Sequence, residues 1–426
     1  MPAPARVLGL ECPRCSSLFE AGLLFTGCPR CGQEGVPVNL GVKLDLAPLA
    51  GVTAEGLADR AAPRGLWQFR ALMPVATERP VTLGEGATPL IHLERLGRRL
   101  GLSRLFAKDE SQNPTWSYKD RLCAVAVTHA VESGARALTI ASTGNHGAST
   151  AAYAARAGLP CVIFTIASVP ETMVTLMQAY GAAVVACPTA ESRWRLMRQG
   201  VEQLGWYPTS GFSLPPIGSN PYGIEGYKTL AYEVAEELHW QAPDLVVVPS
   251  AYSDGLRGVW KGMAELHALG LIKKLPRMVA AEPFGPLARA LERDLEAPEP
   301  VAGGDSVAFS IASRYGTYQG LRALRDSRGL GVTITDEGVF EAQRALGREE
   351  GIYAEPSSAA ALAAVLQLAA RRAVDPDQVV VVVLTSGGLK DPRASRAWLP
   401  DVPAAPDDFP GVLAVLRESY GLELGA

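Results

Sequence analysis

The chain has 426 residues, of which 48% are hydrophobic and 20% are charged, and it carries a formal net charge of -4 at pH 7. This length predicts two large domains and a smaller addition. Because the chain has no block of basic residues and no apolar run long enough to cross a membrane, we expect neither nucleic acid nor a membrane as principal partner. A small molecule is the expected partner, and the start of the chain, which lacks the layout of a signal peptide, predicts a cytoplasmic protein.

Four of the seven cysteines form two Cys-x-x-Cys pairs near the start of the chain, Cys12 with Cys15 and Cys28 with Cys31. Four thiolates at this spacing can complete a tetrahedral shell around zinc, and a reducing compartment disfavours disulfides. We therefore expect residues 1–45 to form a zinc-ribbon-like segment with a structural zinc ion. The alternative is a metal-free hairpin with reduced thiols, which is disfavoured for a segment without a core of its own.

From about residue 60, short β-branched runs alternate with alanine-rich stretches of helical character. The runs ALTIAS, PCVIFTI, DLVVVPS and VVVVVLTSGG are almost entirely apolar, which is typical of parallel strands that helices cover on both faces. The pattern predicts an α/β fold of parallel-sheet, three-layer domains, in which ligands bind where strand ends meet helix starts. Near the end, a linker rich in proline and alanine precedes an amphipathic helix within residues 401–426.

A lone lysine stands in the stretch NPTWSYKD, just before the apolar run LCAVAV. If Ser117 or Asn113 caps the following helix, Lys119 lies in its first turn, where the helix dipole disfavours a positive charge. One use for such a lysine is covalent, because its amine can condense with an aldehyde such as pyridoxal phosphate. The alternative is a solvated lysine paired with Asp120 or Asp109.

The stretch ASTGNHGAS follows the apolar run ALTI and precedes an alanine-rich helix. Its small residues allow backbone amides to converge at the helix N-terminus, where an amino-acid carboxylate can bind. Asn145 adds an amide that could bond a ring hydroxyl, whereas a single histidine such as His146 is more often structural than catalytic.

Two later strand ends offer further polar groups. In PSAYSDGLRGVWKG, hydroxyls and amides at a strand-to-helix junction could bind a phosphate. In LTSGGLKD, the hydroxyl of Thr385 or Ser386 could meet a heterocyclic nitrogen. Together with the lysine and the carboxylate loop, these are the contacts that pyridoxal phosphate and its amino-acid substrate need.

The motifs NPTWSYKDR, STGNHGAS, NPYGIEGYKT, EPSSAAAL and TSGGLKD follow one another in an order that resembles the threonine synthase family. This family belongs to the tryptophan-synthase-β-like pyridoxal-phosphate enzymes, also called fold type II. The resemblance runs from about residue 82 to residue 391 and implies a homodimer. We expect a large cofactor-binding domain from residues 60–115 plus 220–400, and a small inserted domain from residues 116–219.

The resemblance also implies roles for particular residues. It makes Lys119 the Schiff-base lysine, and it places Glu225 and Glu355 in motif positions. The remaining implied contacts are Asn145 with the cofactor's ring hydroxyl, Ser142, Thr143, Gly144 and His146 with the substrate carboxylate, Ser253, Asp254, Gly255 and Leu256 with the cofactor phosphate, and Thr385 with the pyridine nitrogen. A neutral hydroxyl at that nitrogen suits elimination and replacement more than transamination.

The sequence departs from the family where the substrate phosphate is bound. Threonine synthases commonly carry NPxRxEGQKT with a serine a little upstream, and that arginine and serine hold the phosphate. The matching positions here are Gly223 and Gly218, and Tyr227 replaces the glutamine. A charge-assisted contact is worth about 1.5–3 kcal/mol, so its loss is expected to weaken O-phosphohomoserine binding roughly tenfold or more.

We expect a pyridoxal-phosphate-dependent elimination or replacement on an amino acid, with threonine synthase as the leading activity. One alternative is an ammonia-lyase that acts on serine, threonine or diaminopropionate, or a β-replacement enzyme that acts on an activated serine. An alternative from another class is a cofactor-binding regulator without catalysis.

Overall fold

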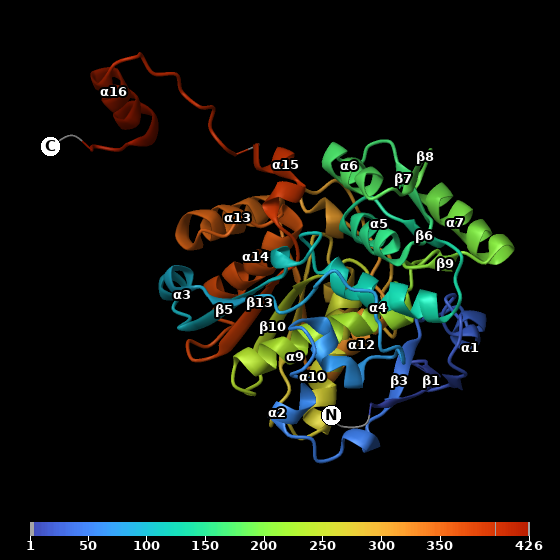
Figure 1. Cartoon of the computed structure of the whole chain (residues 1–426). Helices are drawn as coiled ribbons and strands as arrows, with labels where there is room; N and C mark the ends of the chain where they lie inside the picture. The colour runs from blue at the N-terminus through green and yellow to red at the C-terminus, as the bar shows by residue number, and fades with distance from the viewer. Residues whose placement is uncertain (1–3, 397, 425–426) are drawn as a thin grey trace. The chain divides into compact units, whose positions relative to one another are not determined.

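The computed structural model describes residues 4–396 and 398–424, and its contacts separate residues 1–391 from residues 392–426. Figure 1 shows the elements in chain order. Three sheets lie in the first part. An antiparallel sheet has the order β2-β1-β3, with β1 (Arg6–Glu11), β2 (Leu18–Phe19) and β3 (Gly41–Asp45). A parallel sheet has the order β8-β7-β6-β9, with β6 (Leu138–Ala141), β7 (Cys161–Ile166), β8 (Ala183–Cys187) and β9 (Tyr207–Pro208).

The largest sheet has six strands in the order β12-β11-β10-β13-β5-β4. Neighbours in it are parallel except at the edge, where β4 runs antiparallel to β5. The strands are β4 (Leu90–His92), β5 (Arg104–Asp109), β10 (Leu245–Pro249), β11 (Arg277–Glu282), β12 (Leu330–Thr333) and β13 (Val379–Leu384). The α/β class and the parallel sheets are as the sequence predicts. The antiparallel edge strand β4 has only three residues and was not predicted from the sequence.

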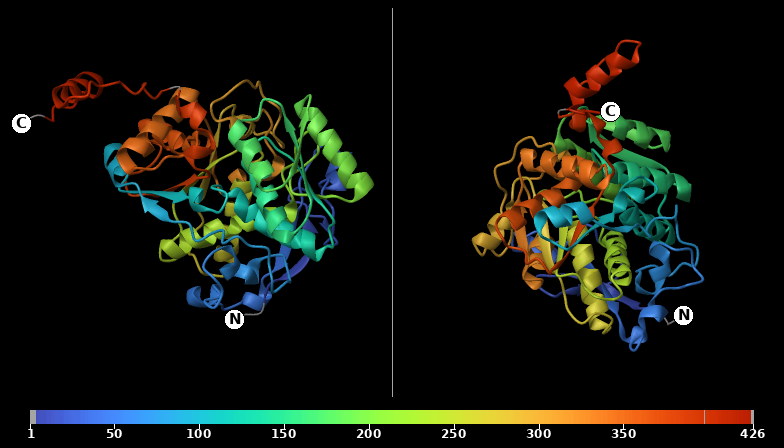
Figure 2. Two further views of the ribbon diagram at one scale, coloured as in Figure 1. Left: turned by 45° about the horizontal axis from the view of Figure 1, so that its top comes forward. Right: turned by 90° about the vertical axis from the view of Figure 1, so that its left-hand side faces the viewer.

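Helices connect the strands and lie beside the sheets in both views of Figure 2. Those between the strands of the four-stranded sheet, and just before it, are α4 (Lys119–Glu132), α5 (Asn145–Ala157), α6 (Glu171–Ala179) and α7 (Ala190–Leu204). Those that accompany the six-stranded sheet are α3 (Glu94–Leu100), α9 (Lys228–Glu237), α10 (Asp254–Ala268), α11 (Pro286–Glu292), α12 (Tyr318–Asp326), α13 (Asp336–Glu350) and α14 (Pro356–Ala370). Short helices are α1 (Pro29–Gln33), α2 (Ala54–Leu57) and α8 (Pro221–Ile224).

The strand β13 explains why the six-stranded sheet is buried on both faces. All six of its residues are apolar and buried. Val381 and Val383 pack in a hydrophobic cluster with residues of α9 and α10, whereas Val380 and Val382 pack in a second cluster with residues of α14. Alternate side chains of a strand point to opposite faces, so an unbroken apolar run requires helices on both sides.

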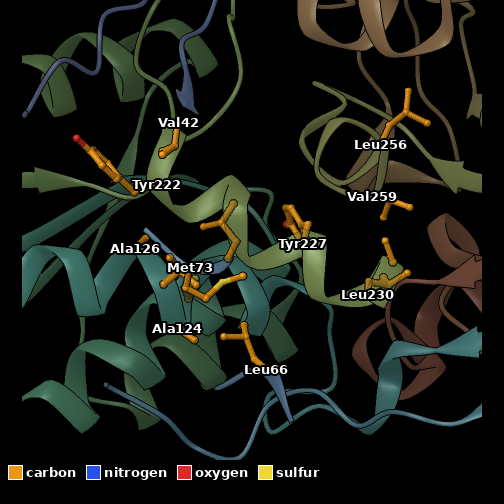
Figure 3. Close-up of a cluster of buried hydrophobic side chains, with 14 of the residues drawn as sticks. Val42, Leu66, Met73, Ala124, Ala126, Tyr222, Tyr227, Leu230, Leu256 and Val259 are labelled. Carbon is orange, nitrogen blue, oxygen red and sulfur yellow. The ribbon is translucent and has the colours of Figure 1, made fainter. Parts of the chain in front are cut away.

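The N-terminal sheet joins the first of these clusters. Val42 of β3 belongs to the same cluster as Tyr222 of α8 and Leu230 of α9, as Figure 3 shows. The hydroxyl of Tyr222 also donates a hydrogen bond to the carbonyl of Gly22 at 3.0 Å. The cysteine-bearing segment is therefore held by the core of residues 1–391, while the expected domain boundaries stay a prediction.

The last residues form α15 (Pro392–Arg396) and α16 (Phe409–Tyr420). The second of these lies where the sequence predicts an amphipathic helix, and Asp408 caps it by accepting the N–H of Gly411 at 2.7 Å. In the described part of the chain, no helix combines the length and hydropathy that a bilayer crossing requires.

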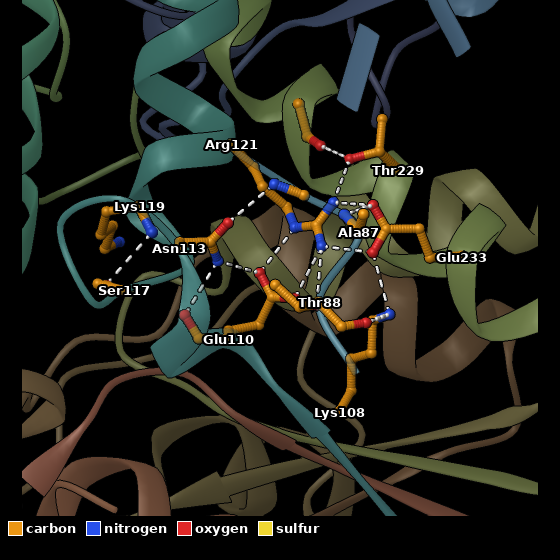
Figure 4. A network of polar contacts seen from close by, with 12 residues as sticks. Ala87, Thr88, Lys108, Glu110, Asn113, Ser117, Lys119, Arg121, Thr229 and Glu233 are labelled. Atoms are coloured by element: carbon orange, nitrogen blue, oxygen red, sulfur yellow. Dashed lines mark hydrogen bonds and ion pairs between the residues drawn. The ribbon is translucent and has the colours of Figure 1, made fainter. Parts of the chain in front are cut away.

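A buried ionic network ties α4 to the six-stranded sheet and to α9 (Figure 4). Arg121 is fully buried, and its guanidinium donates to Glu110 at 2.7 Å and to Glu233 at 2.7 Å. Glu233 also pairs with the buried Lys108 at 3.0 Å. Because each charge has a partner, the network fixes the position of α4 without leaving an isolated ion in the core.

Replacing Arg121 with methionine should destabilise the fold, because it leaves two buried carboxylates short of a partner. We expect the free energy of unfolding to fall by about 3–5 kcal/mol. The matched control is Arg322→Met, which breaks the exposed pair with Asp326 and should change stability by less than about 1 kcal/mol. Urea denaturation followed by circular dichroism measures both, and equal effects would contradict the structural role of the network.

We expect the free energy of unfolding to depend on pH because of Glu282, at the end of β11. Burial raises the pKa of this carboxyl from 4.5 to about 8, although backbone N–H groups of Ala288 and Leu287 oppose the shift. Between these pH values the folded chain binds one more proton than the unfolded chain, so this contribution to stability falls as pH rises. Glu282→Gln should flatten the decline between pH 5 and pH 8 in urea titrations. An unchanged slope would show that Glu282 titrates at its ordinary pKa.

Candidate active site

A pocket of about 260 Å³ opens where strand ends meet helix starts. Its wall includes residues that follow β6, β10 and β13, and the first residues of α4, α5 and α10. The expected residues Lys119, Ser142, Thr143, Gly144, Asn145, His146, Ser253, Asp254, Gly255 and Thr385 all line it. Residues far apart in the sequence thus meet in one place, as expected for the carboxyl ends of parallel strands.

Lys119 is the first residue of α4, and Tyr118 is its N-cap. The cap differs from the expected ones: Ser117 Oγ does accept the N–H of Lys119 at 3.3 Å (Figure 4), but Asn113 turns its amide toward Glu110. The N–H of Tyr118 donates to the carbonyl of Thr385 at 2.9 Å. This bond fixes the start of α4 beside the end of β13.

The amine of Lys119 has no carboxylate within 4.0 Å among the residues that the structure describes. Its Nζ lies 5.0 Å from the ring centroid of Tyr118 and 5.8 Å from that of Tyr227. The alternative of an ion pair with Asp120 or Asp109 is therefore wrong in this structure. Asp120 instead accepts hydrogen bonds from Thr115 Oγ1 at 2.5 Å and Ser149 Oγ at 2.6 Å.

Asp120 is buried, which raises its pKa to about 6, and the hydrogen bonds from Ser149 and Thr115 oppose this rise. These bonds join α4 to the start of α5 and to the segment before Lys119. The neighbour of the lysine is thus a positioning group and does not neutralise the amine.

The loop before α5 is held by its own serine. Ser142 Oγ accepts the N–H of Gly144 at 3.2 Å and of Gly147 at 3.0 Å. His146 follows, with a buried Nε2 atom that has no hydrogen-bond partner among the described residues. Burial, together with the charge of Lys119, lowers the pKa of His146 well below its usual range, so the imidazole is neutral.

Asn145 and Thr385 form the next part of the wall. Asn145 Nδ2 donates to Glu355 Oε2 at 2.8 Å, and Ser310 Oγ donates to Glu355 Oε1 at 2.8 Å. Thr385 Oγ1 shares a hydrogen bond of 2.9 Å with Ser358 Oγ. Glu355 is therefore satisfied by neutral donors, and it orients Asn145 at the pocket surface.

The N-terminus of α10 supplies donors for an anion. Ser253, its N-cap, has a left-handed backbone with φ of 63°, and its buried Oγ has no partner within the described chain. The helix is 15 residues long, and no described residue accepts a hydrogen bond from the N–H groups of Asp254, Gly255 and Leu256. Free N–H groups at the positive end of a helix dipole suit a phosphate.

Two of the expected phosphate residues contribute less than the motif implies. The carboxylate of Asp254 accepts hydrogen bonds from Ser219 Oγ at 2.6 Å and Gln319 Nε2 at 2.7 Å, so only its backbone can serve an anion. Leu256 does not line the pocket, because its side chain is buried in the hydrophobic cluster of Figure 3. Its backbone N–H is the only group it can offer.

The two glycines that stand in the place of the family's phosphate-binding residues differ in position. Gly218 lines the pocket, but it has φ of 120°, and a Cβ there would lie 2.7 Å from Asp254 Oδ1. Gly223 does not line the pocket, and a Cβ there would lie 3.0 Å from Leu122 and Ala126 of α4. Neither position can carry a larger side chain without movement of its neighbours.

Glu225, the other motif carboxylate, is structural. It is buried away from the pocket and pairs with Lys228 at 2.7 Å and with Lys261 at 2.5 Å. These two cations outweigh burial and lower the pKa of Glu225 below its usual range.

Sequence reasoning missed part of the wall. Arg193 and Trp194 of α7, Tyr252 before α10, and the segment 309–313 also line the pocket. Their segments carry no motif, and only the topology brings α7 to the same opening. Nothing in the charged sequence of α7 separates Arg193 from its exposed neighbours.

The assembled groups fit pyridoxal phosphate. Among the described residues they include an amine without a counter-ion, free N–H groups at the start of a long helix for a phosphate, and the unpartnered Ser253 Oγ and His146 Nε2. Lys119, the N-terminus of α10, Asn145 and Thr385 are the groups that would hold it.

Comparison with known proteins agrees with this fit. A family described as pyridoxal-phosphate-dependent enzyme matches residues 81–386. The threonine synthase of Methanocaldococcus jannaschii is 35% identical over 78% of this chain and 82% of its own length. The threonine synthase of Methanosarcina acetivorans is 33% identical over 90% of this chain and 92% of its own length.

A solved structure shows the same fold. The diaminopropionate ammonia lyase of Escherichia coli superposes with a TM-score of 0.63 and 21% identity, covering 74% of this chain and 88% of that one. The resemblance that the motifs indicate is thus confirmed for family and fold. The chain belongs to the pyridoxal-phosphate-dependent enzymes, in the group that includes the threonine synthases.

Proposed function

We propose that the protein is a threonine synthase-like lyase that converts O-phosphohomoserine and water into threonine and phosphate. In this reaction the bond between the γ-carbon and the phosphate oxygen breaks, and water adds at the β-carbon. The family and the lyase type of reaction are shown by the relatives. The substrate is the part that we propose.

The observation that carries the proposal is the position of Lys119. Its amine lies at the start of α4, in a pocket whose other walls offer a helix N-terminus and a small-residue loop. Because no carboxylate of the described residues lies within 4.0 Å, the amine is free to bond an aldehyde and later to accept a proton.

Each proposed role follows from the contacts of the side chain. When bound, pyridoxal phosphate acidifies the α-proton of an amino acid by delocalising the electron pair that remains. Lys119 Nζ takes this proton, and the ring faces of Tyr118 and Tyr227 stabilise the ammonium that forms. The loop from Ser142 to His146 binds the substrate carboxylate, and the neutral His146 adds no competing charge.

The glycines at 218 and 223 favour a second candidate. Both positions are glycines, so they supply neither the serine nor the arginine that binds the phosphate in the family, and a Cβ at either would be crowded by its neighbours. An ammonia-lyase acting on serine, threonine or diaminopropionate, or a β-replacement enzyme acting on an activated serine, would not need those phosphate contacts. Release of a 2-oxo acid, or incorporation of an added thiol, would identify these reactions.

We also propose a structural zinc ion at the four cysteines. Their Sγ atoms all lie within 4.8 Å of one another, with 3.6 Å between Cys12 and Cys31 and 3.7 Å between Cys15 and Cys28. Four ligands at 2.3 Å from a tetrahedral zinc lie about 3.8 Å apart, which is close to these separations. Arg14 donates to Cys31 Sγ at 3.5 Å and would support a thiolate.

The assay for the proposed reaction measures phosphate and threonine after cofactor-loaded protein meets O-phosphohomoserine. We expect equal amounts of both products, and a fall of at least about 100-fold for Lys119→Ala, because the base is lost. The matched control is Lys273→Ala, which changes an exposed lysine and should leave the rate unchanged. A 2-oxo acid from serine, threonine or diaminopropionate, without threonine formation, would replace the leading candidate with the second.

The zinc proposal predicts that Cys12→Ser lowers both the zinc content, from about one ion per chain, and the thermal midpoint. The turnover of the remaining folded protein should change little, because the cysteines lie outside the pocket wall. Cys187→Ser, at a buried cysteine outside the cluster, serves as control and should keep its zinc. Loss of turnover at full stability would contradict a structural role.

A further inference from the structure

Arg193 is a cation in the pocket wall without an assigned role. It lies near the start of α7, and only 9% of its surface is exposed. Among the described residues that line the pocket, Arg193 and Lys119 are the lysine and arginine side chains, and Asp254 and Glu355 are the carboxylates. Lys119 is the proposed site of cofactor attachment, so Arg193 is the positive charge that remains.

The guanidinium lacks a counter-ion. Its Nε donates to the carbonyl of Ala190 at 3.4 Å, and no carboxylate of the described residues lies within 4.0 Å of it. The ring of Trp194, whose centroid is 5.8 Å from Cζ, packs beside it. The other two guanidinium nitrogens make no hydrogen bond to the described protein, and neither of them is fully buried.

This position is unfavourable for a side chain with only a structural role. A buried charge without a partner is costly, and a cation in the first turn of a helix also opposes the helix dipole. The buried arginine of the core, Arg121, has two carboxylate partners, whereas Arg193 has none among the described residues. A ligand that brings a negative charge would remove this imbalance.

The other charged groups of the pocket cannot supply that partner. Asp254 is satisfied by Ser219 and Gln319, and Glu355 by Asn145 and Ser310. Gly218, which also lines the pocket, has no side chain with which to bind an anion. Arg193 is therefore the one guanidinium of the described pocket wall that can receive an anionic group of a substrate.

We propose that Arg193 binds an oxyanion on the side chain of the amino-acid substrate, either a phosphate ester or a carboxylate. The inference rests on the proposed function and adds to it the residue that binds the anionic group of the substrate side chain. The planar fork of a guanidinium matches both oxyanions with two parallel hydrogen bonds. A contact between Arg193 of α7 and this anion would replace the phosphate contacts that Gly218 and Gly223 cannot provide.

The test is a titration of cofactor-loaded protein with pairs of amino acids, in which one member carries an anionic side-chain group and the other a neutral one. Binding is followed by the absorbance of the cofactor. The pairs are O-phosphohomoserine with homoserine, O-phosphoserine with serine, and aspartate with asparagine. We expect the anionic member of at least one pair to bind roughly tenfold or more tightly, because its contact with Arg193 is charge-assisted. The first two pairs report a phosphate ester and the third a carboxylate.

Arg193→Gln should abolish this preference while leaving the affinity for the neutral member unchanged. Arg193→Lys should keep part of it, because the charge remains but the fork is lost. The matched control is Arg195→Gln, which changes an exposed arginine on the same helix and should behave as the wild type. A melting curve of each variant checks that the fold is retained.

Four results would overturn the inference. A preference that survives in Arg193→Gln, or no preference in the wild type, would exclude contact between Arg193 and the substrate anion. A roughly tenfold weaker binding of pyridoxal phosphate by Arg193→Gln would assign the arginine to the cofactor instead. If no amino acid changes the absorbance of wild-type protein, the proposed function fails and this inference fails with it.

Discussion

The position of Lys119 depends on the two buried ionisable residues that follow it in the chain. Asp120 binds Thr115 and Ser149, and Arg121 binds Glu110 and Glu233. These contacts attach the first turn of α4 to α5, to the six-stranded sheet and to α9. The lysine stands at the end of this framework with no carboxylate partner among the described residues, so its amine is fixed in place but chemically free.

The electrostatics of the pocket follow from the same division between satisfied and unsatisfied charges. Its carboxylates, Asp254 and Glu355, accept hydrogen bonds from neutral groups of the protein. Its cations, Lys119 and Arg193, have no carboxylate partners in the part of the chain that the structure describes. Together with the free N–H groups of α10, this arrangement favours an anionic cofactor and an anionic substrate, because the described pocket wall offers no carboxylate to pair with these cations.

The sequence predicts those features that depend on local pattern. The apolar runs predict buried parallel strands, and small-residue turns after such runs predict the loops at Ser142 and Ser253. The position of Lys119 at the start of a helix was also predicted, and its role in binding the cofactor stays a proposal. Contacts between distant segments could not be predicted. Arg193 lines the pocket because the fold brings α7 to the same opening, and Tyr118 occupies the N-cap position of α4. The side chain of Leu256 is buried in the core. Each depends on packing that no short motif records.

The most direct test of this account is to find the residue that carries the cofactor. Borohydride reduction of pyridoxal-phosphate-loaded protein, followed by peptide mass mapping, should place the pyridoxyl group on Lys119. The informative competitor is Lys390, because burial lowers the pKa of its amine to about 8. This amine donates a hydrogen bond to the carbonyl of Thr115 at 2.7 Å. A label on Lys390, or on any lysine other than Lys119, would contradict the central claim that the contacts around α4 position the amine of Lys119 to bind the cofactor.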